Sequence, residues 1–259
     1  MMNEPFELEP ELKTVWLGRH LEHFPSLSST GTLCCQLAEK GAPTGTVVVA
    51  DTQTAGRGRN GSHWESPEGG LWFSLLLRPD CPPAKAAALT AVTAVGLCRG
   101  LLYYPGLGAR IKWPNDLFAD GKKFGGILSE MKVEEGKVAY AVIGVGIDIS
   151  SAGLSENLRA AACGMEDVFG DVVDRKELLC RLLLGLESAY DQFFGGREDL
   201  VFEEWKEHAL FVGETVTAET VSGAVRGKVL GLSGEGFLLL DLGSGKGAKI
   251  ISGRLLTEE

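Results

Sequence analysis

The sequence predicts an α+β protein in which a mixed sheet with helices is followed by a small C-terminal β-barrel. Two observations predict this class. Up to about residue 211, β-branched apolar runs typical of buried strands occur among helix-like segments. From residue 212 the chain keeps only short alternating runs broken by glycines, which predict a barrel of about five strands. We therefore expect an N-terminal lead at 1–25, a larger domain at 26–211 and a small barrel at 212–259.

The first half of the larger domain is predicted from caps and apolar runs. Ser28–Gly41 should be a helix, because Ser or Thr can cap its start and a glycine can end it. The β-branched run Thr46–Gln53 predicts a buried strand, and Leu71–Pro79 predicts a second one. Lys85–Tyr104 is rich in Ala and Leu and predicts a buried helix.

The second half begins with a short strand, Arg110–Asp116, that enters a turn at its proline. Two strands joined at Glu135–Gly136 should be antiparallel, and an Asp–Gly turn precedes them. Leucines at helical spacing then predict helices. The strands expected are Phe124–Glu134 and Lys137–Ile149, and the helices are Asp174–Tyr190 and Leu200–His208.

Composition excludes several classes of protein. The 259 residues, 44% hydrophobic, can form one large core beside a small one. A net charge of −10 disfavours a broad surface for nucleic acid or anionic membrane, so we expect neither partner. The six cysteines form no CxxC pair, which indicates reduced thiols and no zinc site. With no secretory signal and no apolar stretch near the roughly 20 residues of a membrane span, we expect a cytoplasmic protein.

The stretch Gly56–Gly70, GRGRNGSHWESPEGG, directly follows a predicted strand. Glycines let backbone N–H groups approach an anion, and arginines bind carboxylate or phosphate through two donors at once. GRGR alone could equally be a solvated turn. Trp64 favours a ligand site, because an aromatic ring beside an anion loop can cover a planar ligand.

Three later motifs place polar groups or glycines at the ends of predicted strands. KWPND at Lys112–Asp116 could be a structural Asx turn, and Lys123 in KKFGGILSE could be a solvated strand end. IGVGIDI at Ile143–Ile149 lacks the third glycine and the helix of a dinucleotide fingerprint. Its glycines can instead leave room for a ligand on the sheet. The four histidines form no triad or metal pattern, so no metal ligand is predicted.

In their order and spacing, these motifs resemble the biotin–protein ligase family, over nearly the whole chain from Ser28 to Leu256. The resemblance is to the ligase-only group, which lacks the N-terminal DNA-binding domain. It implies a class II synthetase-like catalytic domain with a small C-terminal β-barrel. It also implies that biotin and ATP, with Mg²⁺, form biotinyl-5′-AMP. Biotin then passes to one lysine of a biotin carboxyl carrier domain.

The resemblance also assigns residues. The catalytic residues would be Lys123, Arg57 and Arg59, which offset the charge where two anions meet. The biotin-binding residues would be Ser29, Thr30, Gly31, Gln53, Arg57, Gly58, Arg59, Lys123, Gly126 and Gly144. The ATP-binding residues would be Arg59, Asn60, Trp64, Asn115, Asp116 and Lys123, with Asp116 also a contact for Mg²⁺.

This chain departs from the family pattern at four positions. Gly31 stands where the family often has Asn, Asn60 and Ser62 stand where further arginines are frequent, and Asp148 replaces an Asn. Two alternatives remain open at this point: a lipoate or octanoate ligase or transferase, and a non-catalytic biotin sensor. The resemblance also allows a homodimer through a sheet edge within residues 124–149.

Overall fold

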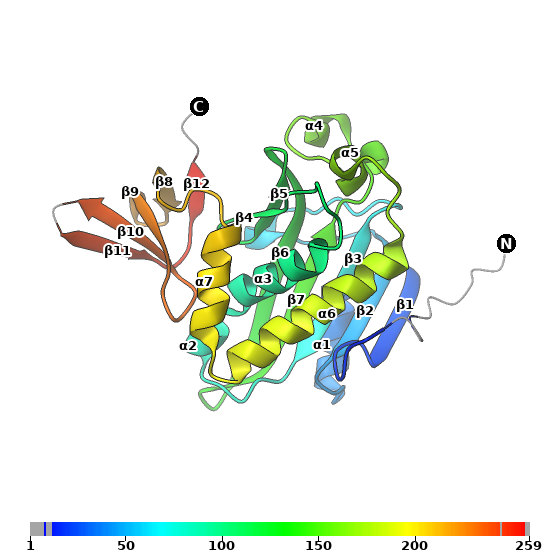
Figure 1. Cartoon of the computed structure of the whole chain (residues 1–259). Coiled ribbons are helices and arrows are strands. Elements are labelled where there is room, and N and C mark those ends of the chain that lie inside the picture. The colour runs from blue at the N-terminus through cyan, green and yellow to red at the C-terminus, as the bar shows by residue number, and fades with distance from the viewer. Residues whose placement is uncertain (1–7, 9–11, 244, 257–259) are drawn as a thin grey trace.

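The computed structural model describes residues 8, 12–243 and 245–256 and contains one large mixed sheet (Figure 1). Its seven strands lie in the order β1-β2-β3-β7-β6-β5-β4. β1 runs parallel to β2, and the other neighbours are antiparallel. The strands are β1 (His20–Leu27), β2 (Thr46–Gln53), β3 (Leu71–Leu77), β4 (Arg110–Lys112), β5 (Asp116–Ala119), β6 (Lys122–Glu134) and β7 (Lys137–Ile147).

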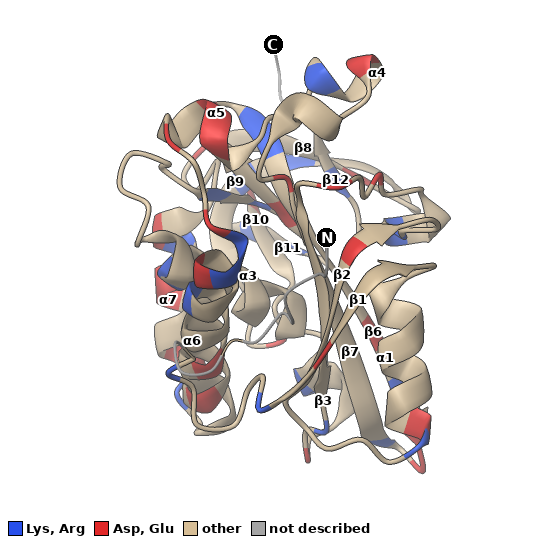
Figure 2. Cartoon of the chain, turned by 90° about the vertical axis from the view of Figure 1, so that its right-hand side faces the viewer, with Lys and Arg blue, Asp and Glu red and all other residues tan. Residues whose placement is uncertain are grey.

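Helices cover both faces of this sheet (Figure 2). On one face α3, α6 and α7 bury the main apolar core, and on the other α1 closes a smaller core that contains Cys34 and Val48. α3 and α6 approach closely because Gly185 lacks a side chain, whose Cβ would lie 2.3 Å from the Gly96 carbonyl oxygen. The helices are α1 (Thr30–Glu39), α2 (Pro83–Ala86), α3 (Leu89–Leu101), α4 (Glu156–Arg159), α5 (Met165–Phe169), α6 (Arg175–Phe194) and α7 (Glu198–His208).

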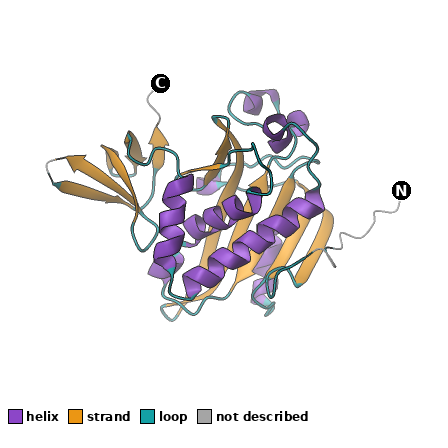
Figure 3. Cartoon of the chain, viewed as in Figure 1, coloured by secondary structure: helices purple, strands orange, loops and turns teal. Residues whose placement is uncertain are grey.

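Residues after α7 form a second sheet of five antiparallel strands, in the order β11-β10-β9-β8-β12 (Figure 3). This fits the small β-barrel-like unit expected from the alternating runs. The strands are β8 (Thr215–Thr220), β9 (Gly223–Leu232), β10 (Leu238–Gly243), β11 (Lys246–Ile250) and β12 (Arg254–Leu256). The division of the chain at residue 211 stays a prediction, and residues 244 and 257–259 lie outside the described part.

Strong local signals gave correct elements. β2 has the bounds that its β-branched run predicts, and β6 and β7 form the expected antiparallel pair joined at Glu135–Gly136. Ser29 caps α1, since its side chain accepts a hydrogen bond from the Thr32 N–H. The Asp120–Gly121 turn has positive φ at both residues, as a tight hairpin requires.

Several expectations were wrong. His20–Leu27 is a strand, although the lead was expected to reach residue 25; it is a polar edge strand without clear alternation, and edge strands tolerate its proline. Residues 1–7 and 9–11 of that lead lie outside the described part. β5, α4 and α5 were not expected, and Lys85–Tyr104 was expected as one helix where α2 and α3 lie.

Two further expectations concern apolar stretches and sheet edges. Pro83–Leu101 is long and apolar enough by composition to span a membrane, contrary to expectation, but 72% of that window is buried inside the fold. Within residues 124–149, β7 is an interior strand. Of the residues described, Leu128–Glu134 of β6 pair with β7 alone, so within residues 124–149 this part could offer a sheet edge to a second copy.

Candidate functional site

Every residue predicted for the site lines one cavity of about 910 Å³. The cavity lies over the sheet, and the second sheet closes part of it through residues 219–221 and 252–255. The predicted residues that line it are Ser29, Thr30, Gly31, Gln53, Arg57, Gly58, Arg59, Asn60, Trp64, Asn115, Asp116, Lys123, Gly126 and Gly144. Segments far apart in the sequence are thus brought to one place.

One end of the cavity is neutral and held by fixed hydrogen bonds. Gln53 Oε1 accepts from the Thr30 backbone N–H at 2.8 Å and from Thr30 Oγ1 at 3.1 Å. Gln53 Nε2 donates to Ser66 Oγ at 2.8 Å. Thr30 Oγ1 also lies 2.8 Å from Ser74 Oγ. Because Ser29, Thr30 and Ser74 are buried, these partners fix the direction of each polar group. We name this group, with Gln53, the neutral end.

The sequence analysis missed Ser74. It lies in the middle of β3, is fully buried and faces the cavity. The usable signal was a hydroxyl inside an otherwise apolar strand, LWFSLLL, because a buried polar group needs a partner.

The other end, the charged end, carries cations that already have acidic partners. Arg57 Nη2 lies 2.7 Å from Glu130 Oε2, and Lys123 Nζ lies 2.6 Å from Asp116 Oδ1. Glu130 is the last residue of the motif KKFGGILSE, and the sequence predicted no function for it.

Arg59 differs from Arg57 and Lys123, because the groups to which it donates hydrogen bonds are neutral. Its guanidinium donates to Asn115 Oδ1 and to the Gly253 carbonyl, both at 3.3 Å, and to Ser252 Oγ at 3.5 Å. Burial lowers its pKa from the ordinary value, and the Asp116 carboxylate opposes that effect. Arg59 therefore joins the seven-stranded sheet to the C-terminal residues across the cavity.

Trp64 lies flat on two glycines of the sheet. A Cβ at Gly146 would come 2.7 Å from Trp64 Nε1, and one at Gly126 would come 3.0 Å from Cζ3. Lys123 Nζ sits 4.9 Å from the ring centroid on a cation–π contact. Trp64 Nε1 is buried and has no hydrogen-bond partner among the described residues. A Cβ at Gly144 would meet the Leu128 carbonyl oxygen and Ser74 Oγ at 3.6 Å, which is ordinary van der Waals contact and involves no atom of Trp64.

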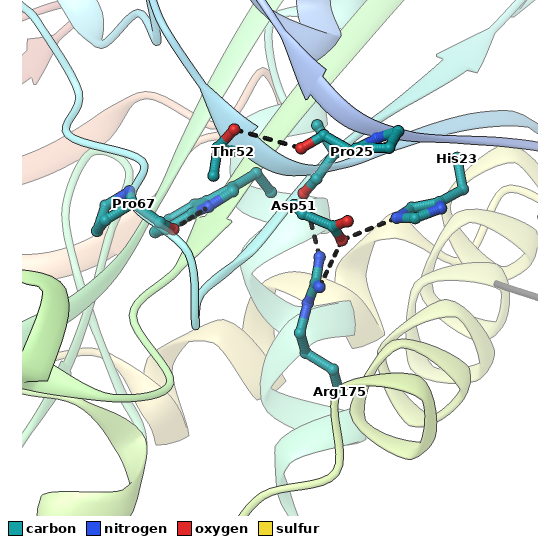
Figure 4. Close-up of polar contacts among 8 residues, drawn as sticks. His23, Pro25, Asp51, Thr52, Pro67 and Arg175 are labelled. Carbon is teal, nitrogen blue, oxygen red and sulfur yellow. Dashed lines mark hydrogen bonds and ion pairs between the residues drawn. The ribbon is translucent and has the colours of Figure 1, made fainter. Parts of the chain in front are cut away.

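A polar cluster fixes the strand end from which the arginine loop leaves (Figure 4). Asp51 Oδ1 accepts from Arg175 Nη1 at 2.6 Å and lies 2.8 Å from His23 Nε2. Burial alone would raise the pKa of Asp51, but these two hydrogen bonds outweigh it and lower the pKa. The cluster ties β2 to β1 and to the first residue of α6, so the loop begins from a rigid point.

The segment that follows β7 holds both the loop and Lys123. Ser155 donates to Glu65 through its N–H at 3.2 Å and through its hydroxyl at 2.9 Å. The Lys123 N–H donates to Ala161 O at 3.2 Å, so the backbone of the lysine is fixed. Nearby, burial raises the pKa of Asp148 to about 7, Lys123 acts against that rise, and Glu65 adds to it.

Comparisons with known proteins agree with this fold. Residues 23–148 match the Biotin/lipoate A/B protein ligase family, and residues 211–254 match the Biotin protein ligase C terminal domain. The chain is 39% identical over 242 residues to the bifunctional ligase/repressor BirA of Bacillus subtilis, covering 92% of this chain and 74% of that protein.

A second relative is the biotin--[acetyl-CoA-carboxylase] ligase of Paracoccus denitrificans, 31% identical, with 74% of this chain and 82% of that protein covered. Among solved structures, the biotin protein ligase of Aquifex aeolicus in complex with biotin and ATP superposes with a TM-score of 0.77 at 30% identity. That match covers 92% of this chain and 98% of the other. The chain belongs to the biotin/lipoate A/B protein ligase family, as one of its biotin protein ligases.

Proposed function

We propose that this protein activates biotin with ATP to give biotinyl-5′-AMP, and then transfers biotin to a lysine of a biotin carboxyl carrier domain. The observation that carries the proposal is the single cavity with a neutral, hydrogen-bonded end and a charged end. The names of the relatives, which include a biotin--[acetyl-CoA-carboxylase] ligase, support the carrier of a carboxylase as the acceptor.

The neutral end would hold the head group of biotin. A ureido ring presents one carbonyl acceptor and two N–H donors, and Ser29, Thr30 and Gln53 offer matching groups in fixed directions. Ser74 extends this set from the floor of the sheet. Gly144 would admit the ligand onto the sheet, because it lines the cavity and has no side chain.

The charged end would perform the activation. A carboxylate oxygen of biotin forms a bond to the α-phosphorus of ATP as the bond to the bridging oxygen breaks, and pyrophosphate leaves. Both reactants are anions, so Arg57, Arg59 and Lys123 would offset their repulsion and the charge that grows in the transition state. The lysine amine of the carrier then attacks the anhydride carbonyl, AMP leaves, and the amine loses a proton.

Mg²⁺ would accompany ATP at this end. Proteins bind this ion through one or two carboxylates, with substrate phosphates and water completing the shell. Asp116 supplies one carboxylate in the cavity, which fits that donor set, while no cluster of three or more possible ligand residues occurs within the described residues. When bound, the ion would neutralise phosphate charge.

The loop from Gly56 to Gly70 would shield the reactive anhydride from water. Trp64 covers part of the sheet beside Lys123, and it would pack on the adenine. Gly58 and Asn60 lie in the same loop and would bring backbone and amide groups to the phosphates. Asn115 would act indirectly, since it bonds both Arg59 and the Ile127 carbonyl.

The test is exchange of labelled pyrophosphate into ATP by the purified protein with Mg²⁺. Separate reactions contain biotin, lipoate, octanoate or no acid. We expect exchange with biotin alone. Exchange with lipoate or octanoate in its place would assign the protein to the other branch of the family, and folded protein inactive with every acid would contradict the proposal. The cytoplasmic location, the homodimer and the absence of a DNA partner remain predictions.

A further inference from the structure

Glu130 is an acidic residue inside a cavity that must receive anions. It lies on β6, lines the cavity, and is paired with Arg57 at 2.7 Å. The two side chains are 39% and 44% exposed, so the pair is in contact with solvent and can open without a large desolvation cost. While the pair is closed, Arg57 presents little net positive charge to a ligand.

Gly31 lies beside the guanidinium of Arg57. A Cβ at Gly31 would be in ordinary van der Waals contact with Arg57 Nη2, at 3.9 Å, and with Ser29 Oγ and Ser74 Oγ, at 3.7 Å. The atoms of a longer side chain would enter the space beside the guanidinium. Because this position has no side chain, that space is left to Arg57, which pairs with Glu130.

We infer that Glu130 is a positioning residue, which holds Arg57 in an ion pair before the ligand binds. The carboxylate of the incoming acid then displaces Glu130 from Arg57. The inference rests on the proposed function and concerns how its site selects a ligand. Every acid must break the same pair, so the closed pair lowers the affinity of all carboxylates by the same factor. An acid that also fills the neutral end keeps enough binding free energy to be bound, whereas an acid without that contact is held too weakly to occupy the site.

The test uses Glu130→Gln, which removes the charge and keeps the shape. Binding of biotin and of its neutral primary amide is measured by titration calorimetry. Because an exposed ion pair is weak, the variant should bind biotin about 1.4- to fivefold more tightly than wild type. The amide has no carboxylate to displace Glu130, and its affinity should not change.

The matched control is Glu134→Gln on the same strand, whose carboxylate pairs with Lys132 at 2.9 Å. Neither Glu134 nor Lys132 is one of the described residues that line the cavity. The affinities of this variant for biotin and for the amide should therefore both stay at wild-type values. In an Arg57→Gln background, Glu130→Gln should no longer strengthen biotin binding. Thermal unfolding of each variant checks that the fold is retained.

Three results would overturn the inference: unchanged or weaker biotin binding by Glu130→Gln, an equal gain for the amide, or a gain that persists without Arg57. Failure of the proposed function has a different signature. In that case wild-type protein itself binds no biotin, whereas failure of this inference leaves wild-type binding intact.

Discussion

The two ends of the cavity are built on different physical principles. At the neutral end, Thr30 forms hydrogen bonds with both Gln53 and Ser74, at 2.8 to 3.1 Å, and Thr30 and Ser74 are buried. At the charged end, Arg57 and Lys123 form ion pairs with carboxylates that remain partly exposed to solvent. Fixed hydrogen bonds can recognise one shape, whereas exchangeable ion pairs can release cations to the reacting groups. We expect the first end to decide which acid binds and the second to decide whether it reacts.

The largest effect should come from the lysine of the charged end. Lys123→Ala removes the cation nearest Trp64 and Asp116, and the rate of pyrophosphate exchange should fall by about 10³-fold, since one electrostatic donor is worth about 10²–10³ and this one carries a full charge. Lys122→Ala is the control, because the neighbouring side chain is exposed and donates only to the Arg159 carbonyl, at 3.4 Å. Comparable losses in both variants would refute the assigned role.

Asp148 gives a pH-dependent test of the surroundings of Lys123. Burial raises its pKa from 3.8 to about 7, so the folded state keeps a proton that the unfolded state has lost. Stability should therefore fall as pH rises from about 4 to about 7, and the full cost remains above that range. Asp148→Asn should remove a cost on the order of 4 kcal/mol at pH 8 and less than about 1 kcal/mol at pH 4.

Urea unfolding of the Asp148→Asn variant and wild type at both pH values measures this difference. Contributions of other titrating groups cancel in the comparison. A gain that is equal at pH 4 and pH 8 would show that the substitution acts through packing and not through the charge of Asp148.

Gln53→Ala tests the neutral end. Its loss removes the acceptor of the Thr30 N–H and the donor to Ser66 Oγ, and one lost buried hydrogen bond costs about 1–3 kcal/mol. The Kd for biotin should therefore rise about 10- to 100-fold, with little change in the KM for ATP. Gln36→Ala, an exposed glutamine on α1, should change neither. A fall in kcat at saturating biotin would break the division between the two ends.

The smallest kinetic effect should come from a substitution at Gly146, the glycine of the sheet on which Trp64 packs. Gly146→Ala places a Cβ 2.7 Å from Trp64 Nε1, so the ring must move by a few tenths of an ångström. We expect the KM for ATP in the exchange reaction to rise about tenfold, since a small misplacement of a positioned group has a large kinetic effect. Gly234→Ala is a fair control, because its Cβ meets nothing within 4 Å.

The parts of the fold that could be predicted have strong local signals. β2 is a run of buried β-branched residues, and the β6–β7 pair follows from a two-residue turn with positive φ at Glu135 and Gly136. β1 was missed because an edge strand pairs through its backbone on one side only, so its side chains need no apolar alternation. β5 has four residues and α4 has four, too few for a period to appear.

The candidate site followed from motifs in order along the chain, and all the predicted residues line one cavity. Their contacts could not be predicted, because they depend on segments far apart in the sequence. The pairing of Arg57 with Glu130, the hydroxyl of Ser74 beneath Thr30, and the bond from Ser155 to Glu65 each need the folded sheet. Gly126 was predicted to bind biotin, whereas the space above it is occupied by the Trp64 ring.

The most direct test of the division between recognition and activation compares two variants in one assay. Pyrophosphate exchange is measured for Gln53→Ala and Lys123→Ala as biotin is raised to saturation. If the two ends act separately, saturating biotin should restore most of the wild-type rate to Gln53→Ala and none of it to Lys123→Ala. The opposite pattern, or equal recovery of both variants, would show that recognition and activation are not divided between the two ends of the cavity.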